Sequence, residues 1–316
     1  MTKKKVNHTP NIFYICRSFF VALVFLFSLL FLTSCNTIPS QQDTSYLTGT
    51  DGIQMNVAYF KPGHKFVQGE YLNLHLDVFN KGVYDNPDGF IKISGYDPAS
   101  IFFNNAQKQL PALVGKKQYL PEGDSYLVRF EETSPLKVNY GSSSKTNLLI
   151  SACYNYQTKA VFPVCVPSMA DYMQGSAVCM PEARSLSSQG APVAVTYVEP
   201  TVGSNMLQFM IHISNVGEGK IVRQDLLENC PLLGYGDFDE VSIRADISSL
   251  GQAQCGTGDV KLLDGEGVAI CQIPISQATD YSYLTEMQIT LDYGYTSSIT
   301  EPIEITNPFY TGKDVN

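Results

Sequence analysis

Six cysteines offer the clearest chemistry in this sequence. They are Cys153, Cys165, Cys179, Cys230, Cys255 and Cys271. Disulfide bonds and a zinc site are the two chemistries that such a set serves. None of the six forms a C-x₂-C pair, and the chain has only four histidines. We therefore expect disulfides, no metal site and no cofactor, although six cysteines allow fifteen connectivities.

A seventh cysteine, Cys35, follows the apolar residues 19–32, which are shorter than the roughly 20 residues that a membrane-spanning helix needs. The basic residues Lys3, Lys4, Lys5 and Arg17 precede it, and no acidic residue does. This order is typical of a secretory signal peptide.

The sequence Leu32-Thr33-Ser34-Cys35 resembles the lipobox of prokaryotic lipoproteins. The resemblance implies that residues 1–34 are removed and that Cys35 is lipidated at its sulfur, a step that suits a nucleophilic thiolate. Acyl chains would then hold the protein on a membrane. An uncleaved membrane anchor over residues 12–32 is the alternative. With either anchor, the rest of the chain would lie in the cell envelope, on the outer side of the membrane.

The charge of the chain disfavours nucleic acid as a partner. Four of the 21 basic residues precede Cys35, whereas all 30 acidic residues follow it. Removal of residues 1–34 would therefore change the net charge from −9 to −13. A surface this negative repels phosphate backbones.

Histidines and carboxylates give weaker signals. His64 lies in a turn-like segment, and His75 and His212 lie on the outward rows of two expected strands. No G-x-S-x-G, H-E-x-x-H or P-loop pattern occurs, so an extracellular hydrolase would need a site built from scattered residues. Two acidic clusters could supply oxygen ligands for Ca²⁺, but their place in solvated turns already explains them. They comprise Asp85, Asp88, Asp237, Asp239 and Glu240.

Tyrosines form the last candidate site. Tyr154 and Tyr156 alternate along one segment, and Tyr293 and Tyr295 alternate along another. Facing outward, each pair would make an aromatic patch for a sugar or a protein partner. Both pairs continue apolar rows, which are Leu148, Ile150 and Ala152 in the first segment and Met287, Ile289 and Leu291 in the second. We therefore expect these tyrosines in the core.

The elements that must position these residues are predicted to be strands. Segments 71–82 and 207–217 both alternate apolar and polar residues, which is the period of a half-buried strand. Further strands are expected at 89–96, 125–132, 240–247, 259–263 and 267–273, with a turn at Asp264-Gly265. Two hairpin-like patterns follow: one over 147–166 with its turn near Gln157 to Lys159, and one that separates 283–295 from 301–305. No convincing helix is found, so the chain is predicted to be all-β, with antiparallel sheets packed as sandwiches.

The sequence also repeats itself. The first strand ends in Asn80-Lys81-Gly82 and the second in Asn215-Val216-Gly217, an offset of about 135 residues, and the two tyrosine pairs recur at an offset of about 139. Two signatures in the same order at nearly the same offset indicate a duplicated unit. Each copy has the size of an immunoglobulin-like module.

Tandem strands of the form LxLxVxNxG on an exported chain resemble the CARDB-type Ig-like modules of prokaryotic surface proteins, similar to uncharacterised surface proteins of small archaea. The resemblance implies two tandem immunoglobulin-like β-sandwich domains and brings no catalytic residues. The expected organisation is a signal peptide (1–34), a flexible stalk (35–52), one sandwich (53–168), a linker (169–190), a second sandwich (191–308) and a tail (309–316).

The strand prediction also suggests disulfide pairs. Cys153 and Cys165 flank the first expected turn, and Cys255 and Cys271 flank the Asp264-Gly265 turn. Cys179 is then left for Cys230, which would tie the linker to the second sandwich. Some of the six could instead be free buried thiols.

The function expected from these features is binding, adhesion or scaffolding rather than catalysis. The lipid on Cys35 would attach the chain to the membrane, and the partner would be another envelope protein or a glycan. An accessory subunit of an envelope secretion or assembly complex is the alternative, and an extracellular hydrolase is a weaker one.

Overall fold

The computed structural model describes residues 45–131, 133–203, 205–275 and 281–310. These described residues form one compact unit. Its regular structure is almost entirely β-strand, in sheets whose pairs are antiparallel except for one short parallel contact. The prediction of an all-β chain with antiparallel sheets is confirmed.

The strands fall into two sets that we call the first repeat (residues 53–166) and the second repeat (residues 193–306). The first holds β1 (Ile53–Tyr59), β2 (Lys65–Val67), β3 (Leu74–Asn80), β4 (Gly89–Ser94), β5 (Gln107–Gln109), β6 (Ser125–Phe130) and β7 (Ser143–Val166). The second holds β9 (Val193–Val202), β10 (Met206–Asn215), β11 (Lys220–Val222), β12 (Glu240–Ile247), β13 (Gly251–Cys255), β14 (Asp259–Lys261), β15 (Glu266–Pro274) and β16 (Tyr283–Thr306).

Short elements connect these strands. They are the 3₁₀ turns η2 (Ser45–Leu47), η3 (Pro62–His64), η4 (Gln224–Asn229) and η5 (Tyr235–Asp237), the helix α2 (Met169–Gln174) and the short strand β8 (Arg184–Ser185). Both α2 and β8 lie in the segment between the repeats that was predicted to be a linker.

Both repeats use the same pairing pattern. In the first, β3 lies between β1 and β6, and β4 pairs with β7. In the second, β10 lies between β9 and β15, and β12 pairs with β16. The strands predicted from alternation, among them β3, β10, β12 and β15, are present, with their apolar rows buried.

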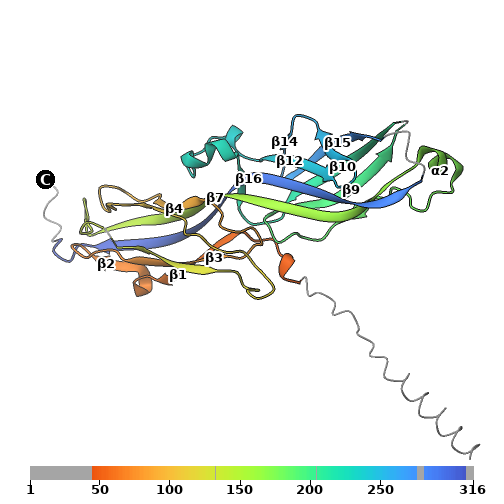
Figure 1. Cartoon of the computed structure of the whole chain (residues 1–316). Helices are drawn as coiled ribbons and strands as arrows, with labels where there is room; N and C mark the ends of the chain where they lie inside the picture. Colours follow the sequence, from red (N-terminus) through yellow and green to blue (C-terminus); the bar gives the residue numbers. More distant parts are fainter. Residues whose placement is uncertain (1–44, 132, 204, 276–280, 311–316) are drawn as a thin grey trace, which may run out of the picture. The chain divides into compact units, whose positions relative to one another are not determined.

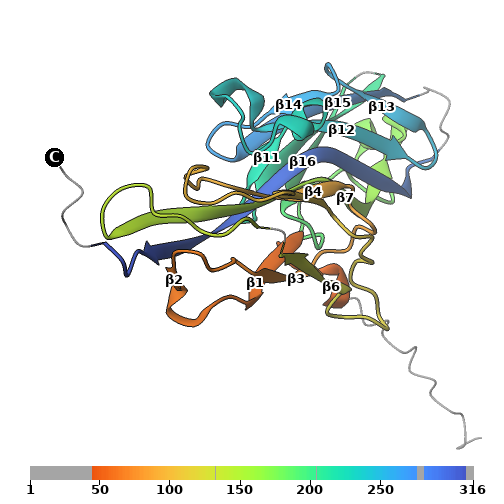
Figure 2. The same ribbon diagram turned by 90° about the vertical axis from the view of Figure 1, so that its left-hand side faces the viewer.

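The longest strands, β7 and β16, join the two repeats. They pair antiparallel along their entire lengths, from Tyr283 opposite Val166 to Thr306 opposite Ser143. Figure 1 shows the two strands side by side through both repeats, and Figure 2 shows β16 running from the second repeat toward the short β2 strand of the first. Each repeat therefore contains part of the other repeat's last strand.

Both predicted hairpin patterns are wrong. β7 continues straight through Gln157 and Lys159, and β16 continues from the tyrosine pair into residues 301–305. Of the polar residues that suggested the turn in β7, Gln157 and Lys159 lie on the outward face of an unbroken strand, whereas Thr158 is buried. Gln157, for example, donates through Nε2 to Asp292 Oδ1 on β16 at 2.6 Å. No glycine or proline interrupts β7 between Cys153 and Phe162.

The disulfides follow from this correction. Because Cys153 and Cys165 lie on one continuous strand, they cannot face each other across a hairpin. The structure pairs Cys165 with Cys179 and Cys153 with Cys230, so the predicted pairs Cys153–Cys165 and Cys179–Cys230 are wrong. The predicted pair of Cys255 and Cys271 is present and joins directly opposed residues of β13 and β15.

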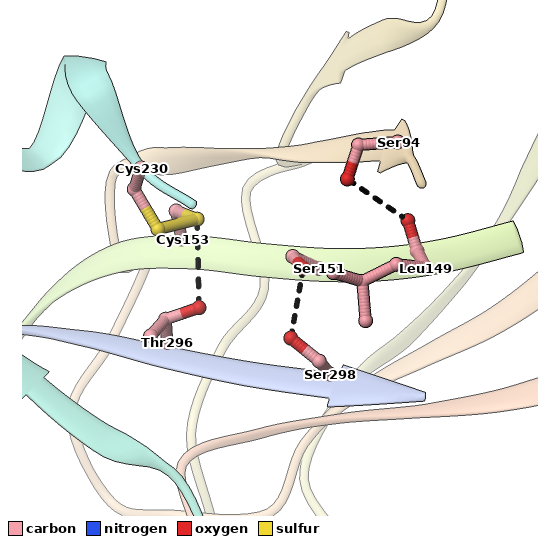
Figure 3. Close-up of a disulfide and its surroundings, with 7 residues drawn as sticks. All are labelled: Ser94, Leu149, Ser151, Cys153, Cys230, Thr296 and Ser298. Carbon is pink, nitrogen blue, oxygen red and sulfur yellow. Dashed lines mark hydrogen bonds between the residues drawn. A yellow bond between two sulfur atoms is a disulfide. The ribbon is translucent and has the colours of Figure 1, made fainter. Parts of the chain in front are cut away.

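The Cys153–Cys230 disulfide ties the first repeat to the second. Cys153 lies on β7 opposite Thr296, and Cys230 follows η4 (Figure 3). Both sulfur-bearing residues are fully buried, in a small cluster with Phe90, Val222 and Leu227. Nearby, Ser151 and Ser298 share a hydrogen bond across β7 and β16 at 2.8 Å (Figure 3).

Removal of the Cys153–Cys230 bridge should cost more stability than removal of Cys255–Cys271. The two bridges close chain segments of 77 and 16 residues, respectively. By loop entropy, the double alanine variants should lose about 4.5 and about 3 kcal/mol of unfolding free energy. Urea unfolding of the two variants measures this difference. An equal or larger loss for Cys255–Cys271 would contradict the role given to the longer bridge.

Candidate functional site

The four tyrosines singled out in the sequence meet where the two repeats join. Tyr154 lies opposite Tyr295, and Tyr156 lies opposite Tyr293, in the β7–β16 pairing. All four are at most 2% exposed. Their ring centroids form a closed set of contacts at 5.7 to 6.3 Å. We call this set the tyrosine cluster; the prediction that these residues are core is confirmed.

The hydroxyl groups of the cluster explain the two repeated sequence signatures. Tyr156 donates to Asn80 Oδ1 at 3.1 Å, at the end of β3. In the second repeat, Tyr295 donates to Asn215 Oδ1, also at 3.1 Å, at the end of β10. A buried amide oxygen would lose free energy without such a donor. In each repeat, the asparagine of the Asn-x-Gly motif thus accepts a hydrogen bond from one tyrosine of the cluster.

The glycine of each motif makes room for the tyrosine. A Cβ atom built on Gly82 would collide with the Tyr156 hydroxyl, and one on Gly217 would lie 2.5 Å from the Tyr295 hydroxyl. Neither glycine has a positive φ. The requirement is therefore close approach and not backbone conformation.

The other two hydroxyls bind the starts of the first strands. Tyr154 Oη accepts from the Ile53 backbone N–H at 3.0 Å, and Tyr293 Oη accepts from the Val193 backbone N–H at 3.4 Å. Tyr293 also shares a hydrogen bond with Thr158 at 2.9 Å. Burial raises the pKa of Tyr154 and Tyr293 well above the usual value, and it raises the pKa of Tyr295 to about 12. These groups are structural donors and acceptors at neutral pH.

A groove opens beside the tyrosine cluster, between the start of β1 and the middle of β16. We call it the β1 groove. Its volume is about 330 Å³. Its walls are residues 50–56 on one side and Ser297, Ser298 and Ile299 on the other, with Tyr154 and Tyr295 beneath and Pro192 and residues 217–219 at one end. Sequence reasoning missed this site because β1 itself was not predicted.

The side chains of the groove are apolar below and acidic at one end. Ile53 and Met55 are buried, and Ile299 packs against the same core. Asp51 and Glu218 line the groove, and both carboxylates help to raise the pKa of Tyr295 after the larger effect of burial. No lysine or arginine is among the residues that line it.

A smaller cavity of about 190 Å³ lies in the second repeat. It is lined by Phe162, Phe209 and Leu284 next to the Cys165–Cys179 disulfide. It lies between β9 and the second half of β7. The β1 groove has the corresponding position in the first repeat, between β1 and β16.

The three histidines expected for a hydrolase lie on three different elements. His75 on β3 pairs with Glu131 at 2.7 Å, and its ring contacts Tyr59. His64 in η3 lies 3.5 Å from Glu301, and His212 on β10 contacts the ring of Tyr197. The structure therefore does not gather these residues into one site.

The acidic clusters stabilise turns. Asp85 accepts from the Gly115 backbone N–H at 2.9 Å and pairs with Lys117. The side chain of Asp88 accepts from Gln109, and that of Asp237 accepts from the Gly234 backbone N–H. Asp239 is in the left-handed region, and Glu240 lies 3.7 Å from Arg223. In the described residues, no three His, Cys, Asp or Glu side chains gather in a group that could hold a metal ion.

Cys35, the predicted signal peptide and the first part of the predicted stalk lie outside the described residues. Of the helices in the described part of the chain, none is long and apolar enough to cross a bilayer.

Comparisons with known proteins give no family. No family model and no curated protein matches the chain. Among solved structures, the CupB6 tip adhesin from Pseudomonas aeruginosa is 11% identical with a TM-score of 0.15, over 82% of this chain and 97% of that chain. A similarity this low carries no argument about fold or function.

Loss of one hydroxyl of the tyrosine cluster should destabilise the protein. Tyr156→Phe leaves Asn80 Oδ1 with only the longer bond from Gly82 N–H at 3.3 Å. We expect a loss of about 1 to 2 kcal/mol in unfolding free energy, and a similar loss for Tyr295→Phe. The control, Tyr140→Phe, removes a hydroxyl from a side chain that is 92% exposed and should change little. Equal stability of all three variants would refute the structural role of these bonds.

The tyrosine cluster should also make the free energy of unfolding decrease at high pH. An unfolded tyrosine loses its proton near pH 10, whereas Tyr295 keeps its proton to about pH 12 in the folded protein. Above pH 10, the folded state therefore binds more protons, and the unfolding free energy should fall by up to about 1.4 kcal/mol per pH unit for each such tyrosine. Urea unfolding between pH 8 and 11.5 tests this. Tyr295→Phe should give a shallower slope than Tyr140→Phe, and identical slopes would contradict the assignment.

Proposed function

We propose that the chain is an exported, lipid-anchored protein of the cell envelope in which two Ig-like sandwiches bind or scaffold a partner. Three disulfides support an oxidising location, since such bonds are rare in reducing compartments. The repeated pairing pattern, in which β3 and β10 each lie between two neighbours and β4 and β12 pair with the long strands, supports the Ig-like assignment.

The observation that carries the proposal is the way in which the two repeats are locked together. The full-length pairing of β7 with β16 and the Cys153–Cys230 disulfide join the repeats along a buried seam. Tandem modules that only space a domain from a membrane need no such seam, because a linker serves that purpose. A single stiff body holds a recognition surface in one orientation, which lowers the entropy lost on binding.

The anchor in this proposal is Cys35. A diacylglyceryl group on its sulfur would place the described body beside the membrane through the stalk. At pH 7 the acidic mature chain would be repelled by anionic lipids, so the acyl chains, and not the protein surface, would provide the attachment.

A second candidate function is an accessory subunit of an envelope secretion or assembly complex. The open β1 groove favours it, because subunits of such assemblies often associate by adding a strand to a free sheet edge. Co-purification of one stoichiometric membrane partner would favour this function. Binding to foreign cells or polymers would favour adhesion.

The anchor is tested by the intact mass of the full-length protein extracted from membranes. The mass should correspond to a chain that starts at Cys35 and carries added acyl mass. Cys35→Ser should abolish both the cleavage and the added acyl mass, because the sulfur that would be lipidated is absent. Cys16→Ser, which replaces a cysteine within the signal, should change neither. A chain that retains Met1, or a Cys35 without acyl mass, would contradict the lipid anchor.

A further inference from the structure

The two repeats differ in what covers the outer edge of their first strand. In the second repeat, residues 184–189 run antiparallel along β9. Arg184 and Ser185 of β8 lie opposite Val198 and Tyr197, and Leu186 N–H donates to Thr196 O at 2.9 Å. The chain thereby fills the edge of β9 with a short extended segment of its own.

The side chain of Gln189 completes this cover. Its Oε1 accepts from the Val195 backbone N–H at 2.9 Å, and its Nε2 donates to the Val195 backbone oxygen at 3.1 Å. Leu186 packs against the core beneath. The backbone groups of Val195 that face away from β10 are thus both bonded.

The same edge is open in the first repeat. Lys81 N–H donates to Gly52 O at 2.9 Å, which fixes the phase of the β1–β3 pairing. In an antiparallel pair, alternate residues direct both backbone groups toward the partner strand. The backbone N–H and C=O groups of Ile53, Met55 and Val57 therefore point away from β3. On that side of β1, no strand pairs with it within the described part of the chain.

Of these outward positions, Ile53 is already bonded to other described residues. Ile53 N–H donates to Tyr154 Oη, and Ile53 O accepts from Ser297 Oγ at 3.2 Å. Met55 follows the start of β1 at the same distance as Val195 follows the start of β9. Met55 in the first repeat is thus the counterpart of Val195 in the second, whose outward backbone groups are bonded by the Gln189 amide.

The opposite wall of the groove has defined ends. On the side of β16 away from β7, β11 covers residues 294–296 and β2 covers residues 304–306. Residues 297–303 lie between these two contacts, and in the described chain no strand pairs with them on that side. The open stretch is therefore as short as β1 itself.

We propose that the β1 groove binds an extended segment of a partner protein, which adds to β1 as an antiparallel strand. The inference rests on the proposed binding function and identifies its site. Residues 184–189 add to β9 in the same way within this chain, and they indicate the form that the occupant takes. Backbone hydrogen bonds to Met55 and Val57 supply the contact, as in other cases of strand addition.

The lining defines the chemistry of the segment. An apolar side chain, in the role of Leu186, packs on Met55 and Ile299. Because the added strand is antiparallel to β1, its C-terminal end lies toward Asp51 and Glu218. A lysine or arginine at that end offsets part of the negative charge of these two carboxylates, for which the residues that line the groove offer no cation.

A display library of seven-residue peptides, selected against the full-length protein in detergent micelles, tests the proposal. Selected peptides should carry an apolar residue followed by a basic residue toward the C-terminus. Fluorescence anisotropy then measures the binding of the best synthetic peptide. Backbone N-methylation should weaken binding about tenfold at every second position and little at the positions between, because alternate N–H groups face β1.

Variants of the protein locate the site. Val57→Pro removes a backbone N–H on the side of β1 away from β3, where a proline leaves the β1–β3 pairing intact, and should weaken binding about tenfold. Val57→Thr keeps the N–H and the branched shape and should bind normally. Asp51→Asn with Glu218→Gln should weaken binding about three- to fivefold at low salt. The methylation scan uses unchanged protein, so it decides the matter even if Val57→Pro does not fold.

Three outcomes would overturn the inference. They are a methylation scan without alternation, peptides whose binding ignores all the variants, and a dimer of the protein itself that Val57→Pro dissociates. None of them bears on the lipid anchor or on binding at another surface. Failure here would thus be separate from failure of the proposed function, which the intact mass of the membrane-extracted protein and capture of an envelope partner decide.

Discussion

The pairing of β7 with β16 is the constraint on which the rest of the structure depends. Each of these strands is 24 residues long and pairs along its whole length. β4 attaches to one and β12 to the other, so the sheets of both repeats continue through this pair. In the first repeat, the sheet of β4 and β7 continues into β16 of the second repeat. In the second repeat, the sheet of β12 and β16 continues into β7 of the first. The two repeats therefore fold as one body, although each is long enough to be a module.

The tyrosine cluster shows why tyrosine, and not phenylalanine, lies at the centre of that pair. Two chain segments enter the seam from each repeat: the start of the first strand and the end of the second. Both bring buried polar groups, and such groups cost free energy unless they are bonded. Four hydroxyls on a buried ring cluster satisfy these groups while the rings fill the core. Removal of the hydroxyls would leave the packing but not the polar partners.

The sequence predicts the local features of this fold well and the long-range ones poorly. Alternation identified β3, β10 and the inward tyrosines, because burial of one face is a local pattern. The false turn at Gln157 arose because a polar residue on the outer face of a long strand looks like a turn when its cross-strand partner, Asp292, is unknown. Two wrong disulfides followed from that single error. The β1 groove depends on strands far apart in the sequence, and no local pattern could have shown it.

The open β1 edge carries a risk as well as an opportunity. A free strand edge is a template for aggregation, and proteins usually blunt or cover it. Here residues 184–189 cover the edge of β9 in the second repeat. In the first repeat, the elements around β1 limit the length of a strand that could pair with its edge. β11 and β2 close β16 at both ends of the groove, and the register of β1 shifts between Val57 and Tyr59. A long strand of another sheet would meet these ends, but a short extended segment would not. Of the first-strand edges of the two repeats, only that of β1 is thus left as a short site for strand addition within the described residues.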